Sequence, residues 1–211
     1  WKERNKAGMQ ELYQKSSSVG LLLSLLGFLG VWIVIDEIFT LIPAYAAGKW
    51  VFFFLMMGRI VDMYFGLNAV IFSTSKKYRV DLFFTVLLIA GVYFANLWLI
   101  PIYGMVGAAI STSAAYFFYN VLRGWYIFRA YQLSPFTPRQ LLLFLNALFA
   151  FFFFAFLDMN IFVQGHVQPF ASFVVKEVLL CLIFVLPIYY WNLEPESVNY
   201  FKQIKNKWLK K

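Results

Sequence analysis

Long apolar runs separated by short polar segments dominate the hydrophobic pattern of the chain. A helix rises about 1.5 Å per residue, so roughly 20 apolar residues cross a hydrocarbon core of about 30 Å. The phenylalanine clusters in these runs show no alternation of period two, which argues against a transmembrane barrel. The pattern therefore predicts an all-α polytopic membrane protein. We expect six transmembrane helices, at residues 19–42, 49–72, 80–100, 104–128, 141–157 and 170–191.

Polar segments flank this predicted membrane region at both ends. Residues 1–18 mix basic residues with an apolar face, so we expect an amphipathic cytoplasmic segment that lies in the membrane interface and leads into the first span. The apolar face consists of Met9, Leu12 and Tyr13. Residues 19–191 are predicted to form the six-helix lobe, and 192–211 a basic cytoplasmic tail. Because the first residue is Trp1 and no signal-peptide pattern follows, we expect the chain to be the later part of a longer protein.

The basic residues predict the orientation of the spans. Cytoplasmic loops near transmembrane helices carry an excess of Lys and Arg. In the six-span arrangement only Lys49 lies on the outer side, and an even number of spans places both termini in the cytoplasm. The basic residues of the predicted cytoplasmic side are Lys2, Arg4, Lys6, Lys15, Lys76, Lys77, Arg79, Arg129, Arg139, Lys202, Lys205, Lys207, Lys210 and Lys211.

Composition supports the membrane assignment and narrows the possible partners. Hydrophobic residues make up 62% of the 211 residues and charged residues 13%, and the mean hydropathy is +0.71. The net charge of +8 is explained by topology and by attraction to anionic lipid headgroups, so membrane lipid is the expected partner and nucleic acid is not. The single cysteine, Cys181, excludes a disulfide framework or a zinc cluster within the chain.

Two stretches carry a resemblance to a known family. Residues 101–119 read PIYGMVGAAISTSAAYFFY, and residues 66–79, leaving the second span, read GLNAVIFSTSKKYR. Together with the segment before the first span, they resemble the C-terminal half of bacterial polysaccharide flippases, the O-antigen type of the multidrug/oligosaccharidyl-lipid/polysaccharide exporter superfamily, which is MATE-like.

The resemblance implies a transporter of twelve helices in two six-helix lobes, with this chain as the second lobe and the N-terminal lobe missing. The implied substrate is an undecaprenyl-diphosphate-linked oligosaccharide, carried across the bacterial inner membrane for polysaccharide biosynthesis. The implied partners are that lipid-linked oligosaccharide and the missing lobe of the same transporter.

The second predicted span contains two charges near its middle. At 100° per residue, Arg59, Asp62, Gly66 and Ser73 share one narrow face of an otherwise apolar helix. A charge at that depth needs a partner, a bundle interior or water. One interpretation is an internal Arg59–Asp62 pair that only joins helices. The other is that Arg59 lines a hydrated cavity and binds an anionic substrate, while Asp62 holds its side chain in place.

Five further charged residues of the predicted spans are candidate site residues. Arg123 and Lys176 either extend toward the headgroups or bind substrate. Asp36 and Glu37 form an interfacial helix end or, together with Glu177, are candidates to bind a coupling H⁺ or Na⁺, because an acid in a membrane span is a candidate for ion relay. No other cofactor and no metal is expected.

Small and amide side chains in the spans predict packing contacts. Gly104 and Ala108, and Gly107 with Ser111 and Ala115, follow small-xxx-small spacing and predict a close helix seam. Four asparagines are expected to form hydrogen bonds between helices: Asn68, Asn96, Asn120 and Asn146.

Nothing in the sequence requires covalent chemistry, so we do not expect an enzyme. His166 stands alone in the longest outer loop, and no catalytic triad or phosphate-binding loop is present. The preferred function is a lipid-linked oligosaccharide flippase. The alternatives are a drug or lipid II exporter of the same superfamily, a membrane-embedded glycan polymerase, ligase or acyltransferase, and an assembly subunit without catalytic activity.

Overall fold

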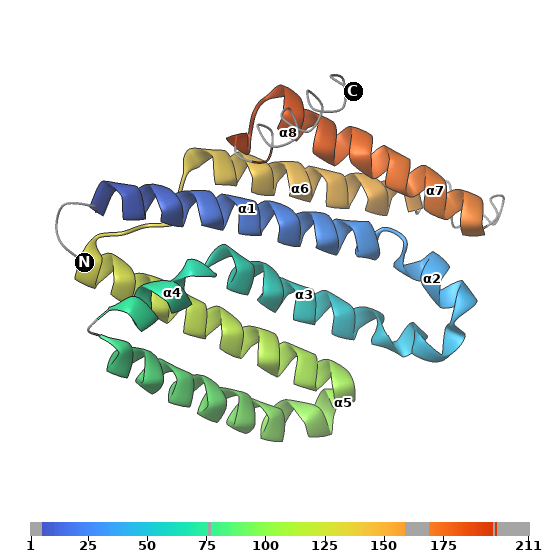
Figure 1. The fold of residues 1–211 in the computed structure, drawn as a ribbon. Coiled ribbons are helices and arrows are strands. Elements are labelled where there is room, and N and C mark those ends of the chain that lie inside the picture. Colours follow the sequence, from blue (N-terminus) through green and yellow to red (C-terminus); the bar gives the residue numbers. More distant parts are fainter. Residues whose placement is uncertain (1–5, 76, 159–168, 196, 198–211) are drawn as a thin grey trace, which may run out of the picture. The chain divides into compact units, whose positions relative to one another are not determined.

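A computed structural model describes residues 6–75, 77–158, 169–195 and 197, and these residues form helices without any strand. The α-helices are α1 (Lys6–Trp32), α2 (Ile35–Leu41), α3 (Lys49–Tyr64), α4 (Leu67–Thr74), α5 (Tyr78–Tyr131), α6 (Pro138–Leu157), α7 (Pro169–Leu180) and α8 (Leu186–Tyr190) (Figure 1). A 3₁₀ helix, η2 (Pro43–Gly48), precedes α3, and a π-helical turn, η4 (Cys181–Val185), joins α7 to α8. His166, most of the outer loop around it, residues 1–5 and most of the predicted tail lie outside the described residues.

Five helical stretches of the described chain are long and apolar enough to cross a membrane. They are Lys6–Trp32, Pro43–Tyr64, Tyr78–Tyr131, Pro138–Leu157 and Phe170–Tyr190. The prediction of an all-α membrane protein is therefore confirmed at the level of secondary structure and hydropathy.

The longest of these stretches, α5, is a helical hairpin. Gly104 has φ +57° and ψ −132°, a conformation that favours glycine, and the chain reverses there (Figure 1). The first arm (78–103) and the second arm (105–131) correspond to the third and fourth predicted spans. Side-chain pairs along the hairpin show that the arms are antiparallel: Asp81 with Arg123, Thr85 with Tyr119, and Asn96 with Ser111.

The chain divides into two compact units, and the boundary lies within α1. The first unit consists of Trp1–Ser24 and Ala47–Phe136, and the second of Leu25–Ala46 and Thr137–Lys211. The core of the first unit joins α1, α4 and α5 through Tyr13, Ile71, Phe72, Ile127 and Leu133. In the second unit, α6 packs against the end of α1, where the ring of Phe151 lies 6.1 Å from those of Phe28 and Trp32.

Helix α1 differs from the prediction for this part of the chain. It passes through Ser18 without a break and ends at Trp32, while α2 covers much of the remainder of the first predicted span. Ser24 is accommodated inside the helix, because its hydroxyl donates to the Leu21 carbonyl at 3.0 Å. The interfacial position of the first part stays a prediction.

The second predicted span is not one helix. A turn at Phe65 and Gly66 separates α3 from α4, so Ser73 does not continue the face of Arg59 as predicted. Tertiary contacts explain the turn: Asn68 is completely buried in α4 and bonded to α1 and α5. A straight apolar helix would leave that amide without these partners.

The last predicted span also departs from regular α-helix. The π-helical turn η4 lies immediately before Pro187, which cannot donate a backbone hydrogen bond. The Asn146 amide of α6 donates to the Phe184 carbonyl within this turn at 3.0 Å. A side chain from α6 thus satisfies a backbone carbonyl of the irregular turn.

The close approach of α3 and α5 at Gly58 gives the first testable prediction. A Cβ at Gly58 would lie 2.9 Å from the Ser113 Cα, so Gly58→Ala should lower the free energy of unfolding by about 1–3 kcal/mol. Gly27→Ala is the matched control, because a Cβ there meets nothing within 4 Å and alanine favours helix. Thermal unfolding in detergent measures the difference, and equal midpoints for the two variants would contradict the packing described.

Candidate functional site

A chain of hydrogen bonds in the first unit ends at Arg59. The Tyr13 hydroxyl of α1 donates to the Asn68 Oδ1 of α4, and the Asn68 amide donates to the Asn120 carbonyl of α5 at 3.4 Å. The Asn120 side chain donates to Asp62 Oδ1 at 3.3 Å, and Arg59 Nη1 donates to Asp62 Oδ2 at 3.1 Å. Four helices therefore contribute to the position of one carboxylate, and that carboxylate holds the guanidinium.

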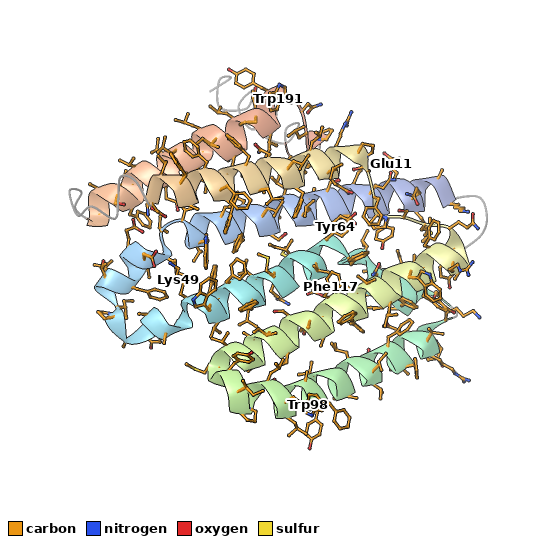
Figure 2. The ribbon with its side chains drawn as sticks, turned by 180° about the vertical axis from the view of Figure 1, so that it is seen from behind. Glu11, Lys49, Tyr64, Trp98, Phe117 and Trp191 are labelled. Carbon is orange, nitrogen blue, oxygen red and sulfur yellow. The ribbon has the colours of Figure 1, made fainter. Side chains whose placement is uncertain are left out.

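Arg59 differs from the rest of this chain of hydrogen bonds because it is exposed. Its side chain is 60% exposed, whereas Tyr13, Asn68 and Asn120 are buried. Lys49 and Tyr64 mark the two ends of α3 in Figure 2, and Arg59 lies ten residues beyond Lys49, about 15 Å along the helix axis. The guanidinium thus lies within an apolar helix, about two thirds of the way from Lys49 to Tyr64, where a charge needs water or a counter-ion.

The structure contains a feature that each interpretation of the Arg59–Asp62 pair requires. The internal ion pair exists, with the two residues three positions apart on α3. Asp62 also holds Arg59 as the second interpretation requires, and Asn120 in turn holds Asp62. Because Asp62 accepts a bond from Nη1, the exposed guanidinium retains further N–H groups with which it can donate to an anion.

Arg123 is buried, so the predicted extension toward the headgroups is wrong. Only 5% of the residue is exposed, and its Nη2 lies 2.8 Å from Asp81 Oδ1 on the other arm of α5. The guanidinium also lies 4.7 Å from the centre of the Tyr119 ring and 5.3 Å from that of Phe72. These contacts make Arg123 a link between the two arms of the hairpin.

The second unit contains a buried ionic cluster, formed by Glu37, Asp158, Ser172 and Lys176. Lys176 Nζ lies 2.6 Å from Glu37 Oε1 and 2.6 Å from Asp158 Oδ1. The Ser172 hydroxyl donates to Glu37 Oε1 at 2.5 Å. Only 2% of Lys176 is exposed, so the interpretation that it extends to the membrane surface is wrong.

This cluster carries more negative than positive charge. With all three groups ionised, two carboxylates share one ammonium, and burial in a low-dielectric setting makes the excess costly. Burial also raises the pKa of the Asp158 carboxyl above its usual range, although the bond to Lys176 acts in the opposite direction. One added monovalent cation would neutralise the cluster.

The other two acids that were predicted to bind a coupling ion are more exposed than Glu37. Asp36 precedes Glu37 on α2 and is exposed, and Glu177 of α7 is partly exposed. Of the three acids predicted to bind a coupling ion, the structure places only Glu37 in the buried cluster.

Three participants were missed by the sequence analysis. Asp81 and Asp158 were not singled out, and Tyr13 was placed on an interfacial face, yet each is joined to a buried polar group. The two aspartates could have been found from the sequence, because Arg123 and Lys176 lie within apolar spans and cations there need acidic partners.

Most of the predicted packing residues are confirmed, but Gly104 lies at the exposed turn of the hairpin and not in the seam. The four asparagines all form contacts between helical segments: Asn68, Asn96, Asn120 and Asn146. Gly107 and Ser111 are buried in the seam between the arms of α5. Among the described residues, no group of three or more His, Cys, Asp or Glu could hold a metal ion.

Comparisons with protein-family models, with curated proteins and with solved structures find no match for this chain. The functional assignment therefore depends on the geometry of these polar groups and on the sequence pattern.

The ionic cluster gives the second prediction. Lys176→Met leaves the buried carboxylate of Glu37 and the partly buried carboxylate of Asp158 without a cation, and should lower the free energy of unfolding by about 3–5 kcal/mol. Combining it with Glu37→Gln and Asp158→Asn should recover part of that loss, because the buried charge is then removed. Glu177→Gln is the control on the same helix. Unfolding in detergent measures all three, and equal stability of Lys176→Met and Glu177→Gln would show that the cluster is not buried.

Proposed function

We propose that this chain is the C-terminal lobe of a flippase in the bacterial inner membrane that carries undecaprenyl-diphosphate-linked oligosaccharide to the outer leaflet for polysaccharide biosynthesis. One observation supports the proposal above all: an exposed guanidinium, held by Asp62, lies about two thirds of the way along an apolar helix. Such a charge is costly in lipid unless it lines a watery cavity or binds an anion.

The chemistry of the substrate matches this arrangement. A lipid diphosphate brings negative charge to the membrane interior, and a guanidinium binds phosphate oxygens with two parallel hydrogen bonds. Asp62 and Asn120 fix the orientation of Arg59 before any anion arrives. A preorganised cation loses less conformational freedom on binding than a free arginine side chain.

The number of helices agrees with one lobe of a MATE-like transporter. When the two arms of α5 are counted separately, the five apolar stretches provide six membrane crossings. On this proposal the exposed face around Arg59 borders a cavity whose other wall is the missing N-terminal lobe. Both termini of the described lobe would then lie in the cytoplasm, as the distribution of basic residues predicts.

The buried cluster supplies a candidate for energy coupling within the same proposal. Binding of one H⁺ or Na⁺ at Glu37 and Asp158 would remove the excess negative charge. A cation that changes the electrostatic free energy of a buried cluster can favour one conformation of a transporter over another.

The role of Arg59 is tested in a transporter that contains both lobes. Arg59→Gln should abolish display of the glycan at the cell surface, because the cation for the diphosphate is lost. The double variant Arg59→Gln with Asp62→Asn separates the two interpretations. If the pair only joins helices, removing both charges should restore display; if Arg59 binds substrate, display should stay absent.

Two controls accompany this experiment. Arg139→Gln removes an exposed charge at the start of α6 and should leave display unchanged. The amount of each variant in the membrane is measured by fluorescence-detected size exclusion. Normal display by Arg59→Gln at normal expression would overturn the proposed function.

The coupling prediction concerns Glu37. In the same two-lobe transporter in vesicles, Glu37→Gln should remove the dependence of transport on the proton or sodium gradient that drives the wild type. Asp36→Asn is the matched control, since Asp36 is the exposed neighbour on the same short helix. If Glu37→Gln retained the full dependence on the gradient, the cluster would not be the coupling site.

A further inference from the structure

An apolar groove runs between the two arms of α5. Its cavity volume is about 260 Å³, and small residues on both arms create the space. The small residues that line it are Gly91 and Ala95 on the first arm, and Ser111, Ala114 and Ala115 on the second. An engineered apolar cavity of about 150 Å³ stays dry and binds benzene, so this groove has room for a hydrocarbon segment.

The few polar groups in the groove wall are already satisfied. The Ser111 hydroxyl bonds to Asn96 and to the Ala108 carbonyl, and the Tyr119 hydroxyl lies 3.4 Å from that of Thr85. The remaining lining residues are aromatic or aliphatic. A hydrocarbon chain therefore fits this groove better than water or a polar ligand.

The length of the groove matches one leaflet of a bilayer. Its lining on the first arm extends from Phe84 to Ala95, a rise of about 17 Å. Half of a hydrocarbon core of about 30 Å is close to that length. The first arm carries its large apolar side chains outward, and Trp98 projects away from the hairpin in Figure 2. The groove thus opens on a surface suited to lipid.

Two cations lie at the open end of the hairpin. Lys77 is the residue that precedes the first arm, and Arg129 lies in the last turn of the second arm, so the antiparallel arms bring both to the same end. Arg129 follows the lining residue Leu122 by seven positions and therefore lies on the groove face of its arm. Both side chains are exposed, and the Arg129 guanidinium lies 5.8 Å from the centre of the exposed Trp125 ring. An interfacial tryptophan beside a cation is typical of the headgroup level of a membrane.

We propose that the hairpin of α5 binds one anionic phospholipid, with an acyl chain in the groove and the phosphate at Lys77 and Arg129. Charge complementarity identifies the occupant: the apolar groove accepts the chain, and the two cations at its end select a negative headgroup. This end of the hairpin lies on the predicted cytoplasmic side, where anionic lipids contribute about 1 kcal/mol of attraction per basic residue. The site is independent of the proposed transport function and of Arg59.

Photolabelling of the purified full chain in nanodiscs tests the site. The probe is phosphatidylglycerol with a photoreactive group in one acyl chain, diluted into phosphatidylcholine, and the labelled peptides are identified by mass spectrometry. Residues 84–95 and 111–122 should be labelled. Arg129→Gln should weaken labelling about fivefold, the factor expected for one basic residue at the surface. Arg139→Gln, an exposed arginine in the second unit, should have no effect.

A second variant tests the groove apart from the charges. Gly91→Leu fills the groove from the first arm and should reduce labelling at both segments to the level of a phosphatidylcholine probe. Gly27→Leu is its control on α1, where the added side chain meets open space. Equal labelling by the phosphatidylcholine and phosphatidylglycerol probes, or unchanged labelling in Arg129→Gln, would overturn the proposal. Stronger labelling by a polyprenyl phosphate probe than by phosphatidylglycerol would also overturn it, because the occupant would then be an isoprenoid.

Discussion

The low dielectric inside a bundle of apolar helices is the constraint on which the rest of this structure depends. A polar group buried there needs a partner, and two asparagines of the described chain show how side chains from different helices supply it. Asn68 bonds to both α1 and α5, and Asn146 satisfies the π-helical turn before Pro187. Hydrogen bonds of the amide side chains thus favour particular helix pairs and particular bends. Contacts between apolar surfaces are less specific and favour many pairings equally.

The charged groups follow the same constraint and fall into two kinds. Arg123 and Lys176 are buried and paired, and their contribution is to hold helical segments in place. Arg59 is paired but exposed. Since a buried pair needs no further ligand, Arg59 is the one of these three cations that a substrate anion can reach. That contrast is the physical basis of the proposed substrate contact.

The two proposals place different lipids on different parts of the first unit. Arg59 of α3 would bind the diphosphate of a transported lipid for a short time, within a watery cavity. The groove of α5 would hold a resident phospholipid, whose headgroup meets Lys77 and Arg129. A resident lipid at the hairpin would fill the space left by small residues and so stabilise the contact between its arms.

The sequence by itself determined the helical class, the apolar stretches, the break near Gly104 and the hydrogen-bonding role of the asparagines, because these follow from composition and local periodicity. It also indicated Arg59 and Asp62 as partners, since they lie three positions apart on one helix. Only the tertiary structure decided that Glu37 meets Ser172, 135 positions away, and that Asp158 completes the same cluster. The tertiary structure likewise decided that α3 and α4 are separate helices, with a turn just before the buried Asn68. Hydropathy is a local property of the chain, whereas the partner of a buried charge depends on which helices pack side by side.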